Sequence, residues 1–190
     1  MEMADVDQLV RAVKNGDKQH YGTIVSNYQQ HLFKYCFHML GQLQEAEDVT
    51  QDVFVKGLER LEQYREGTSF RAWLYKIAYH ECLNKLKRAQ IYDGILRLFS
   101  RSMSVLQSDQ PTEGLAYNVE LQGALLQLTP KERHIILLRI VEENRFEEIA
   151  EQLDISYSAV RKRYERALKK LKGYLVNKEA GEDEQHFSYL

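Results

Sequence analysis

The chain has 190 residues, a formal net charge of −2 at pH 7, and a composition of 44% hydrophobic and 28% charged residues. Such a composition is typical of a soluble globular protein and excludes a disordered or fibrous chain. The longest apolar runs, such as HIILLRIV at 134–141, are too short to span a bilayer. The N-terminus MEMADVDQL lacks the basic-then-apolar pattern of a secretory signal. We therefore expect a cytoplasmic protein with one domain or two small ones.

Helical periodicity runs through the whole chain. Apolar residues recur at i, i+3, i+4 and i+7, strand-type alternation is scarce, and only two prolines occur. This pattern predicts an all-α fold. In the first half we expect helices at 5–14, 18–40 and 44–63, and a fourth that follows a turn at 65–70 and ends near residue 89. Cys36 and Cys82 lie in apolar helical contexts and are expected to be reduced core residues.

A segment rich in helix-breaking residues divides the two halves. Residues 91–115 contain Gly94, SRSMS and SDQPTEG, and we interpret them as an interdomain linker. Its apolar residues could form a short docking helix (Ile95, Leu96, Leu98 and Phe99). Further helices are expected at 117–127, 130–142, 145–153 and 157–175. The acidic tail at 177–190 lacks periodicity and is expected to be frayed, so the predicted domains are 1–90 and 116–176.

Several short signals predict where helices begin and end. Gly41 is a C-terminal stop for the second helix, and Thr68 or Ser69 can cap the fourth. In LTPKER, Thr129 is a candidate N-cap, Pro130 takes the first helical position, and Glu132 stands close to the capping-box position.

Positive charge is concentrated near the end of the chain. The stretch SYSAVRKRYERALKKLKG at 156–173 carries seven Lys or Arg residues and one acid, Glu165. A short helix with Phe146, Ile149 and Ala150 on one face precedes it, and DIS at 154–156 turns the chain. Residues 142–154 carry six acids and one Arg, so the basic residues are reserved for the second helix. This is the plan of a helix-turn-helix, whose second helix lies in the DNA major groove. A merely solvated charged helix is the alternative.

The helix expected at 44–63 has an acidic face. Asp48 and Asp52 are four residues apart, with Glu45 and Gln51 on nearby turns. A solvated helix face is one interpretation. A catalytic carboxylate pair is less favoured, because nothing nearby supplies a His or Ser partner.

The next helix, 68–88, has the opposite charge. It carries five Lys or Arg residues against one acid, Glu81, and aromatic residues are interleaved with them. Basic groups follow a phosphate backbone while aromatic faces and pockets receive unstacked bases, so the mixture suits single-stranded DNA. Trp73 falls in register with Leu74 and Ile77, which favours a core position for it.

Two segments resemble one known family. LTPKERHIILLRIVEENRFEEIAEQLDISYSAVRKRYERALKKLK at 128–172 resembles region 4 of bacterial sigma factors, and AEDVTQDVFVKGLERLEQYREGTSFRAWLYKIAYHECLNKLKR at 46–88 resembles their region 2. The arrangement is similar to that of the extracytoplasmic-function (ECF) group. The resemblance implies an alternative sigma factor that binds core RNA polymerase and directs promoter-specific initiation, without enzymatic activity, catalytic residues, cofactor, metal or small-molecule substrate. The implied partners are the β′ clamp helices, the β flap, promoter DNA and an anti-sigma factor.

The resemblance also implies roles for individual residues. The acidic face would bind the clamp helices (Glu45, Asp48, Gln51 and Asp52). The −35 element would be read by the second helix of the helix-turn-helix (Ser156, Tyr157, Ser158, Arg161, Lys162, Arg163, Glu165 and Arg166). Recognition and melting of the −10 element would fall to the 64–88 region (Tyr64, Arg65, Thr68, Ser69, Phe70, Arg71, Lys76, His80, Asn84, Lys87 and Arg88), where the loop from Tyr64 to Phe70 holds a flipped base.

The chain departs from the family pattern at two positions. Members usually have Asn where His80 stands, and often an Asp near Asn84, so the −10 preference does not transfer. HECLN at 80–84 is also no zinc-protease motif, because Asn84 replaces the second histidine. Two rival functions are a stand-alone helix-turn-helix regulator, whose N-terminal helices dimerise or sense a ligand, and a helical adaptor that binds only proteins.

Overall fold

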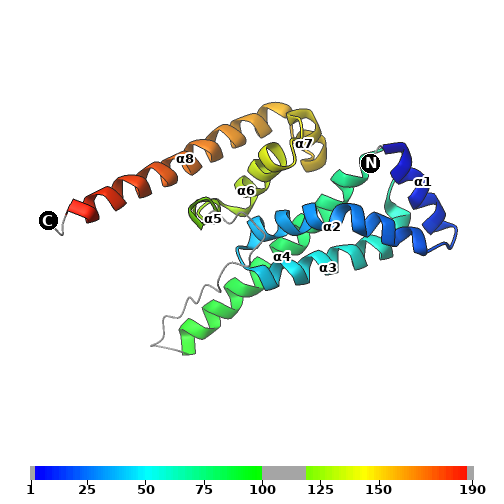
Figure 1. The fold of residues 1–190 in the computed structure, drawn as a ribbon, viewed down its shortest axis with the longest axis horizontal. Helices are drawn as coiled ribbons and strands as arrows, with labels where there is room; N and C mark the ends of the chain where they lie inside the picture. The colour runs from blue at the N-terminus through cyan, green and yellow to red at the C-terminus, as the bar shows by residue number, and fades with distance from the viewer. Residues whose placement is uncertain (1–2, 100–118, 188–190) are drawn as a thin grey trace. The chain divides into compact units, whose positions relative to one another are not determined.

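The computed structural model describes residues 3–99 and 119–187, with side chains over 5–91 and 119–176. Every regular element within the described residues is helical, which confirms the predicted all-α class. The chain divides into two compact units, 1–109 and 110–190, and the order of their helices can be followed in Figure 1. No helix in the described part of the chain is long and apolar enough to cross a membrane.

The described part of unit 1 contains four α-helices and one 3-10 turn. In chain order they are α1 (Met3–Lys14), α2 (Gln19–Leu40), α3 (Leu43–Glu59), the turn η1 (Leu61–Gln63) and α4 (Phe70–Phe99). Helices α2, α3 and α4 pack on one another, and α1 packs on α2. Their shared core contains Ile24, Leu32, Tyr35 and Leu74, none of which is exposed. Cys36 and Cys82 are buried thiols in this core, as predicted.

Two glycines permit the close turns and contacts of unit 1. Gly41 ends α2 with φ +82°, in the left-handed region that favours glycine, and its N–H donates to the Phe37 carbonyl. On α3, a Cβ at Gly57 would lie 2.9 Å from the Tyr21 hydroxyl. That hydroxyl donates to the Phe54 carbonyl at 2.6 Å, so a glycine at 57 lets α2 and α3 approach closely. Burial raises the pKa of Tyr21, which therefore keeps its proton.

The described part of unit 2 is also helical. It contains α5 (Val119–Leu126), α6 (Pro130–Ile136), a π-helical turn η2 (Leu137–Val141), α7 (Phe146–Leu153) and α8 (Tyr157–Phe187). The predicted capping box at Thr129 is confirmed. Its side chain accepts from the Glu132 N–H at 3.3 Å, and the Glu132 carboxylate accepts from the Thr129 N–H at 3.1 Å. Pro130 takes the first helical position.

A buried arginine joins α5 to α6. Arg133 is only 4% exposed, and its guanidinium donates to the carbonyls of Leu125 at 2.8 Å, Leu126 at 3.0 Å and Leu128 at 3.1 Å. The carbonyls of Leu125 and Leu126 belong to the last turn of α5 and that of Leu128 to the connection after it, where a helix leaves carbonyls short of donors; the Leu125 carbonyl also accepts from the Leu128 N–H at 3.1 Å. Arg133 therefore acts as a C-terminal cap made by a side chain from the next helix.

Four predicted boundaries were wrong. Helix α4 continues to Phe99, so 91–99 extends this helix and is not linker. Helix α8 continues to Phe187, through most of the tail that was expected to fray. The segment 44–63, expected as one helix, is α-helical only to Glu59 and continues as a 3-10 turn from Leu61. The segment 130–142, also expected as one helix, is α-helical to Ile136 and π-helical from Leu137. Residues 100–118, and the side chains of Ile95, Leu96, Leu98 and Phe99, lie outside the described part.

Candidate functional site

The acidic face of α3 is exposed in unit 1. Asp48, Gln51 and Asp52 are exposed and Glu45 is half-buried. Their spacing of three and four residues places them on one side of the helix. Val55, at 57% exposure, continues this side one turn further, so the face is mixed acidic and apolar. Leu58 is also partly exposed, at 37%.

Two lysines form ion pairs that tie α3 to α4. The Lys85 ammonium lies 2.5 Å from the Glu45 carboxylate and 3.7 Å from that of Asp48. Lys56 on α3 pairs with Glu81 on α4. Lys85 is one of the five basic residues of the 68–88 segment, yet it binds the acidic face of α3. The role of Lys85 in orienting Glu45 was not predicted from the sequence.

The exposed side of α4 carries a stripe of polar and basic groups. Lys76, His80, Asn84 and Lys87 are exposed, and their spacing of four, four and three residues keeps them on one helical face. Arg88 is exposed beside this stripe, and Arg71 is half-buried, with its guanidinium 5.8 Å from the Tyr75 ring centroid. The structure thus brings Lys76, His80, Asn84 and Lys87 together on one face, which does not include Arg71 or Lys85.

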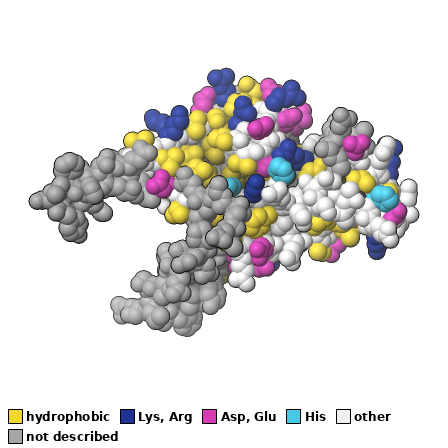
Figure 2. Space-filling model, viewed as in Figure 1, with side chains coloured by type: hydrophobic (Ala, Val, Ile, Leu, Met, Phe, Trp, Pro, Cys, Tyr) yellow, Lys and Arg dark blue, Asp and Glu magenta, His cyan; other side chains and the backbone are white. Residues whose placement is uncertain are grey.

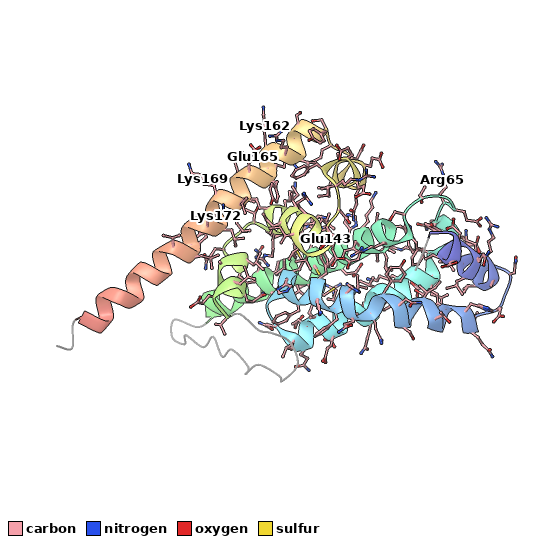
Figure 3. All side chains as sticks on the ribbon, turned by 45° about the horizontal axis from the view of Figure 1, so that its top comes forward. Arg65, Glu143, Lys162, Glu165, Lys169 and Lys172 are labelled. Atoms are coloured by element: carbon pink, nitrogen blue, oxygen red, sulfur yellow. The ribbon has the colours of Figure 1, made fainter. Side chains whose placement is uncertain are left out.

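The loop that precedes α4 rests on aromatic rings. The Tyr64 ring centroid lies 5.1 Å from that of Phe70 and 5.7 Å from that of Trp73. Tyr64 and Phe70 are 3% and 2% exposed, so these two predicted site residues form the base of the loop. Trp73 is half-buried, between the core position favoured from the sequence and a surface position. Arg65, Thr68 and Ser69 are exposed in the loop, where Arg65 points outward (Figure 3).

Ser69 also begins α4. Its hydroxyl accepts from the Ala72 N–H at 3.1 Å, which confirms Ser69 as the N-cap of the two candidates. The Thr68 hydroxyl instead donates to the Arg65 carbonyl at 2.6 Å and closes the loop on itself.

The helix-turn-helix of unit 2 consists of α7 and α8. Helix α7 ends at Asp154, which adopts a left-handed conformation with φ +52° and turns the chain. Ser156 then caps α8, because its hydroxyl accepts from the Ala159 N–H at 3.3 Å. Ser158 lies 3.2 Å from it, hydroxyl to hydroxyl. The two helices pack through buried apolar side chains (Ile149, Ala150, Val160 and Ala167).

Aromatic contacts hold the start of α8 on α7. The Phe146 ring lies edge-on to those of Tyr157, at 6.1 Å, and Tyr164, at 5.2 Å. Tyr157 is nevertheless 43% exposed, so one side of its ring remains available at the surface. The Arg139 guanidinium lies 5.2 Å from the Phe146 centroid.

The outer side of α8 is a basic surface with one acid in it. Lys162, Glu165, Arg166 and Lys169 line a shallow open groove. Figure 3 shows Lys162, Glu165 and Lys169 along one side of the helix, and Figure 2 shows Lys and Arg gathered along one edge of the molecule. Arg161 pairs with Glu165 at 3.0 Å, whereas Arg163 turns aside and is half-buried. The predicted basic residues therefore do not all share one surface.

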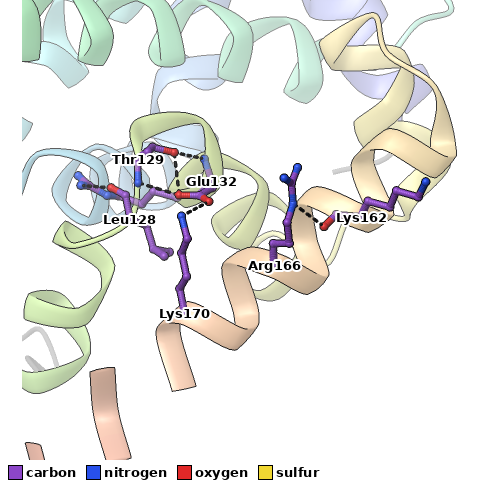
Figure 4. A network of polar contacts seen from close by, with 7 residues as sticks. Leu128, Thr129, Glu132, Lys162, Arg166 and Lys170 are labelled. Atoms are coloured by element: carbon purple, nitrogen blue, oxygen red, sulfur yellow. Dashed lines mark hydrogen bonds and ion pairs between the residues drawn. The ribbon is translucent and has the colours of Figure 1, made fainter. Parts of the chain in front are cut away.

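An ion pair at Lys170, further along α8, attaches this helix to α6. Lys170 lies 2.6 Å from the Glu132 carboxylate, and the Arg166 Nε donates to the Lys162 carbonyl at 3.4 Å (Figure 4). Partial burial raises the pKa of Glu132, but the hydrogen bonds from Lys170 and Thr129 outweigh it and lower this pKa overall. Glu132 therefore stays ionised, keeps α6 capped and fixes the position of α8 on it.

Comparison with known proteins decides the family. Residues 24–91 match the family model of Sigma-70 region 2, and residues 118–171 match that of Sigma-70, region 4. The chain belongs to the sigma-70 family. The sigma factor YlaC of Bacillus subtilis is 34% identical over 148 residues, which cover 76% of this chain and 86% of YlaC. The ECF sigma factor SigW of the same organism is 28% identical over 187 residues, covering 92% and 98%.

Solved structures share the fold of this sigma factor. CnrH, in complex with the cytosolic domain of CnrY, has a TM-score of 0.66 at 22% identity and covers 90% of this chain and 97% of its own. RpoE of Bartonella quintana, in complex with the anti-sigma factor NepR, has a TM-score of 0.65 at 20% identity, covering 83% and 97%. With regions 2 and 4 in order and ECF relatives of similar length, the chain is an alternative sigma factor that directs RNA polymerase to promoters.

Proposed function

We propose that this sigma factor divides its work between the described surfaces. The acidic face of α3 binds the β′ clamp helices of core RNA polymerase. The loop 64–69 and the exposed stripe of α4 bind the −10 element and stabilise its melted strand. Helix α8 reads the −35 element. The observation that carries this proposal is the segregation of charge: an acidic exposed face on α3, and basic exposed surfaces on α4 and α8, in a chain whose net charge is only −2.

Single residues take different parts in this scheme. Lys76, His80, Asn84 and Lys87 are exposed on one side of α4 and are proposed to contact the melted strand. Tyr64 and Phe70 are buried, so we assign them to supporting the loop rather than to contacting bases. Electrostatic contacts with phosphates supply affinity, and stacking on the half-buried Trp73 can supply more.

The remaining partners follow from the same scheme. Unit 2 is proposed to contact the β flap, and an anti-sigma factor is proposed to inhibit the protein. RpoE of Bartonella quintana, which shares the fold, is complexed with an anti-sigma factor. We propose a cytoplasmic location and a purely regulatory role without covalent catalysis, because core polymerase supplies the chemistry.

Transcription by core polymerase tests the function directly. Fragmented genomic DNA of the source organism is transcribed by core enzyme with and without the chain, and the 5′ ends of the transcripts are sequenced. We expect a small set of new start sites that share upstream sequences. Binding of the chain to specific DNA without new start sites would favour a stand-alone helix-turn-helix regulator, and an absence of DNA binding would favour a protein adaptor.

Removing single arginines from α8 tests the −35 assignment. Arg161→Ala and Arg166→Ala are each expected to lower selectivity for the cognate promoter. A bidentate Arg–guanine contact contributes roughly 1–3 kcal/mol of discrimination. If one of the two contacts phosphate instead, its removal weakens all sequences about equally and lowers the salt slope by about one. Competition transcription on cognate and −35-scrambled promoters at several salt concentrations separates these effects.

Lys131→Ala serves as the control for this experiment, because Lys131 is an exposed cation on α6 outside the α8 groove. It should leave selectivity unchanged. Unaltered transcription from the cognate promoter in both arginine variants would reject the assignment of α8.

A further inference from the structure

Helix α1 holds the loop 64–69 through three side chains from one of its faces. Asp7, Arg11 and Lys14 are four and three residues apart, which aligns them along α1. Arg11 Nε lies 2.6 Å from the Glu66 carboxylate. Lys14 Nζ donates to the Tyr64 carbonyl at 3.2 Å. Each contact joins residues at least 50 positions apart in the sequence.

Asp7 makes the most specific of these contacts. One carboxylate oxygen accepts from the Tyr64 hydroxyl at 2.8 Å, and the other accepts from the Gly67 N–H at 2.9 Å. Gly67 has φ +76°, a conformation that fixes the apex of the loop and disfavours residues other than glycine. Both oxygens of one carboxylate therefore fix the start and the apex of the same loop.

The Tyr64 end of this network is kept protonated. Burial, followed by the hydrogen bond to Asp7, raises the pKa of Tyr64, so the phenol remains a donor throughout the physiological range. Its proton is shared between Asp7 and the Thr68 carbonyl, which lies 2.6 Å from the hydroxyl oxygen. The loop is consequently fixed from α1 on one side and from its own backbone on the other.

We propose that α1 is a brace that preorganises the loop 64–69 to capture an unstacked promoter base, with Asp7 as the central positioning residue. The inference rests on the proposed function of this loop. Residues 3–14 precede the segment that matches the region 2 model, which begins at residue 24. Arg65, Thr68 and Ser69 remain exposed to contact DNA while the braced backbone holds them in place.

The physical effect of the brace is to lower the cost of base capture. A free loop loses conformational freedom when it closes on a ligand, and a loop held in its bound shape has already lost it. Loosening the brace should therefore slow promoter opening and weaken binding to the melted strand. It should leave core binding unchanged, because the acidic face of α3 makes none of these contacts.

Asp7→Asn is the matched variant for the test. An Asn side chain places an NH₂ donor where one of the two carboxylate oxygens stood, so the Tyr64 hydroxyl or the Gly67 N–H loses its acceptor on this side chain, and the other bond is no longer charge-assisted. Asp5→Asn removes the same charge from the same helix and leaves both hydrogen bonds from the loop to Asp7 in place, so it is the control for the loss of charge. For each protein we would measure amide hydrogen exchange at Gly67, affinity for core polymerase, and the rate of opening at a promoter identified by the transcription experiment above.

We expect Asp7→Asn to accelerate Gly67 exchange, to leave core affinity within about twofold, and to slow opening about tenfold, which corresponds to 1.4 kcal/mol. Asp5→Asn should match the wild type. Abasic substitutions along the −10 non-template strand add a readout that general destabilisation would not produce. One abasic substitution should reduce the DNA affinity of the wild type the most, because it removes the captured base. On DNA with that substitution, wild type and Asp7→Asn should bind with equal affinity.

Two outcomes would overturn the brace. Unchanged exchange at Gly67 would mean that Asp7 does not hold the loop in solution. Faster exchange with an unchanged opening rate would mean that the loop geometry does not matter for capture. Failure of the wild-type holoenzyme to open any promoter would be distinguishable from both, since it would reject the proposed function and the inference that rests on it.

Discussion

Replacing Asp48 and Asp52 together by lysine is expected to abolish binding to core RNA polymerase while helix content stays intact. Both side chains are exposed on α3, and an exposed substitution typically changes the free energy of unfolding by under about 0.5 kcal/mol. In the proposed complex this face pairs with a basic surface of core polymerase, so reversing two charges would bring like charges together and cost several kcal/mol of binding energy. Binding of labelled chain to core polymerase measures the effect, and circular dichroism measures the helix content.

The matched control lies in unit 2. Glu147 and Glu151 are also exposed acids four residues apart, on α7. Glu147→Lys with Glu151→Lys makes the same change in net charge and should retain most of the affinity for core polymerase. Normal co-purification of the Asp48→Lys, Asp52→Lys variant would show that the α3 face is only solvated.

Arg133→Met is expected to destabilise unit 2 by roughly 2–4 kcal/mol. Methionine fills much of the same space, but it has no donor for the carbonyls of Leu125, Leu126 and Leu128. Leaving a buried acceptor unpaired costs about 1–3 kcal/mol. The variant loses two buried hydrogen bonds, to the carbonyls of Leu125 and Leu128, and only that of Leu125 keeps a backbone donor, the Leu128 N–H. The expected result is a shift of the urea unfolding transition of unit 2 to lower denaturant concentration.

One tryptophan makes the two units separable in this measurement. Trp73 is the only tryptophan of the chain and lies in unit 1. Its fluorescence reports the unfolding of unit 1, so the fluorescence transition of Arg133→Met should occur at the same urea concentration as that of the wild type. Part of the circular dichroism signal of the variant should be lost at a lower urea concentration than in the wild type. Lys131→Met, an exposed neighbour, should shift neither signal. If Arg133→Met unfolds like the wild type by both probes, the three hydrogen bonds are not what holds α5 on α6.

Features that depend on neighbouring residues could be predicted from the sequence. The glycine at the end of α2 and the capping box at Thr129 each involve groups within four residues, and both were predicted correctly. The apolar spacing also located the described helices. Local backbone sterics and side-chain hydrogen bonds decide these features, so the sequence alone is sufficient for them.

The ends of α4 and α8 were predicted too early. Gly94 and Gly181 were the breakers available in these segments, and no proline occurs from residue 131 onward. One glycine costs a formed helix only about 1 kcal/mol relative to alanine, and adding residues to an existing helix is far easier than starting one. Both helices therefore continue past Gly94 and Gly181, where the sequence becomes less typical of a helix.

Contacts between distant residues could not be predicted. Nothing near Asp7 indicates that it accepts from Gly67, 60 residues later. The Lys85–Glu45 pair likewise depends on how α3 and α4 pack. The family resemblance implied that Tyr64 and Phe70 belong to a base-binding loop, and only the packing of unit 1 shows that both side chains are buried. The types of surface followed from the sequence, whereas the division between contacting and supporting residues needed the fold.

The basic surface of α8 also has an energetic consequence for the isolated protein. Lys162 and Arg166 are four residues apart, as are Arg166 and Lys170, whereas Glu165 is the acid at that spacing from both Arg161 and Lys169. Like charges at this spacing destabilise a helix by about 0.2–0.5 kcal/mol per pair. In the free protein the Lys and Arg side chains along α8 therefore repel one another. Added salt screens this repulsion, and a bound polyanion such as DNA neutralises it. Unit 2 should accordingly melt at a higher temperature on DNA than can be accounted for by the contacts to bases alone.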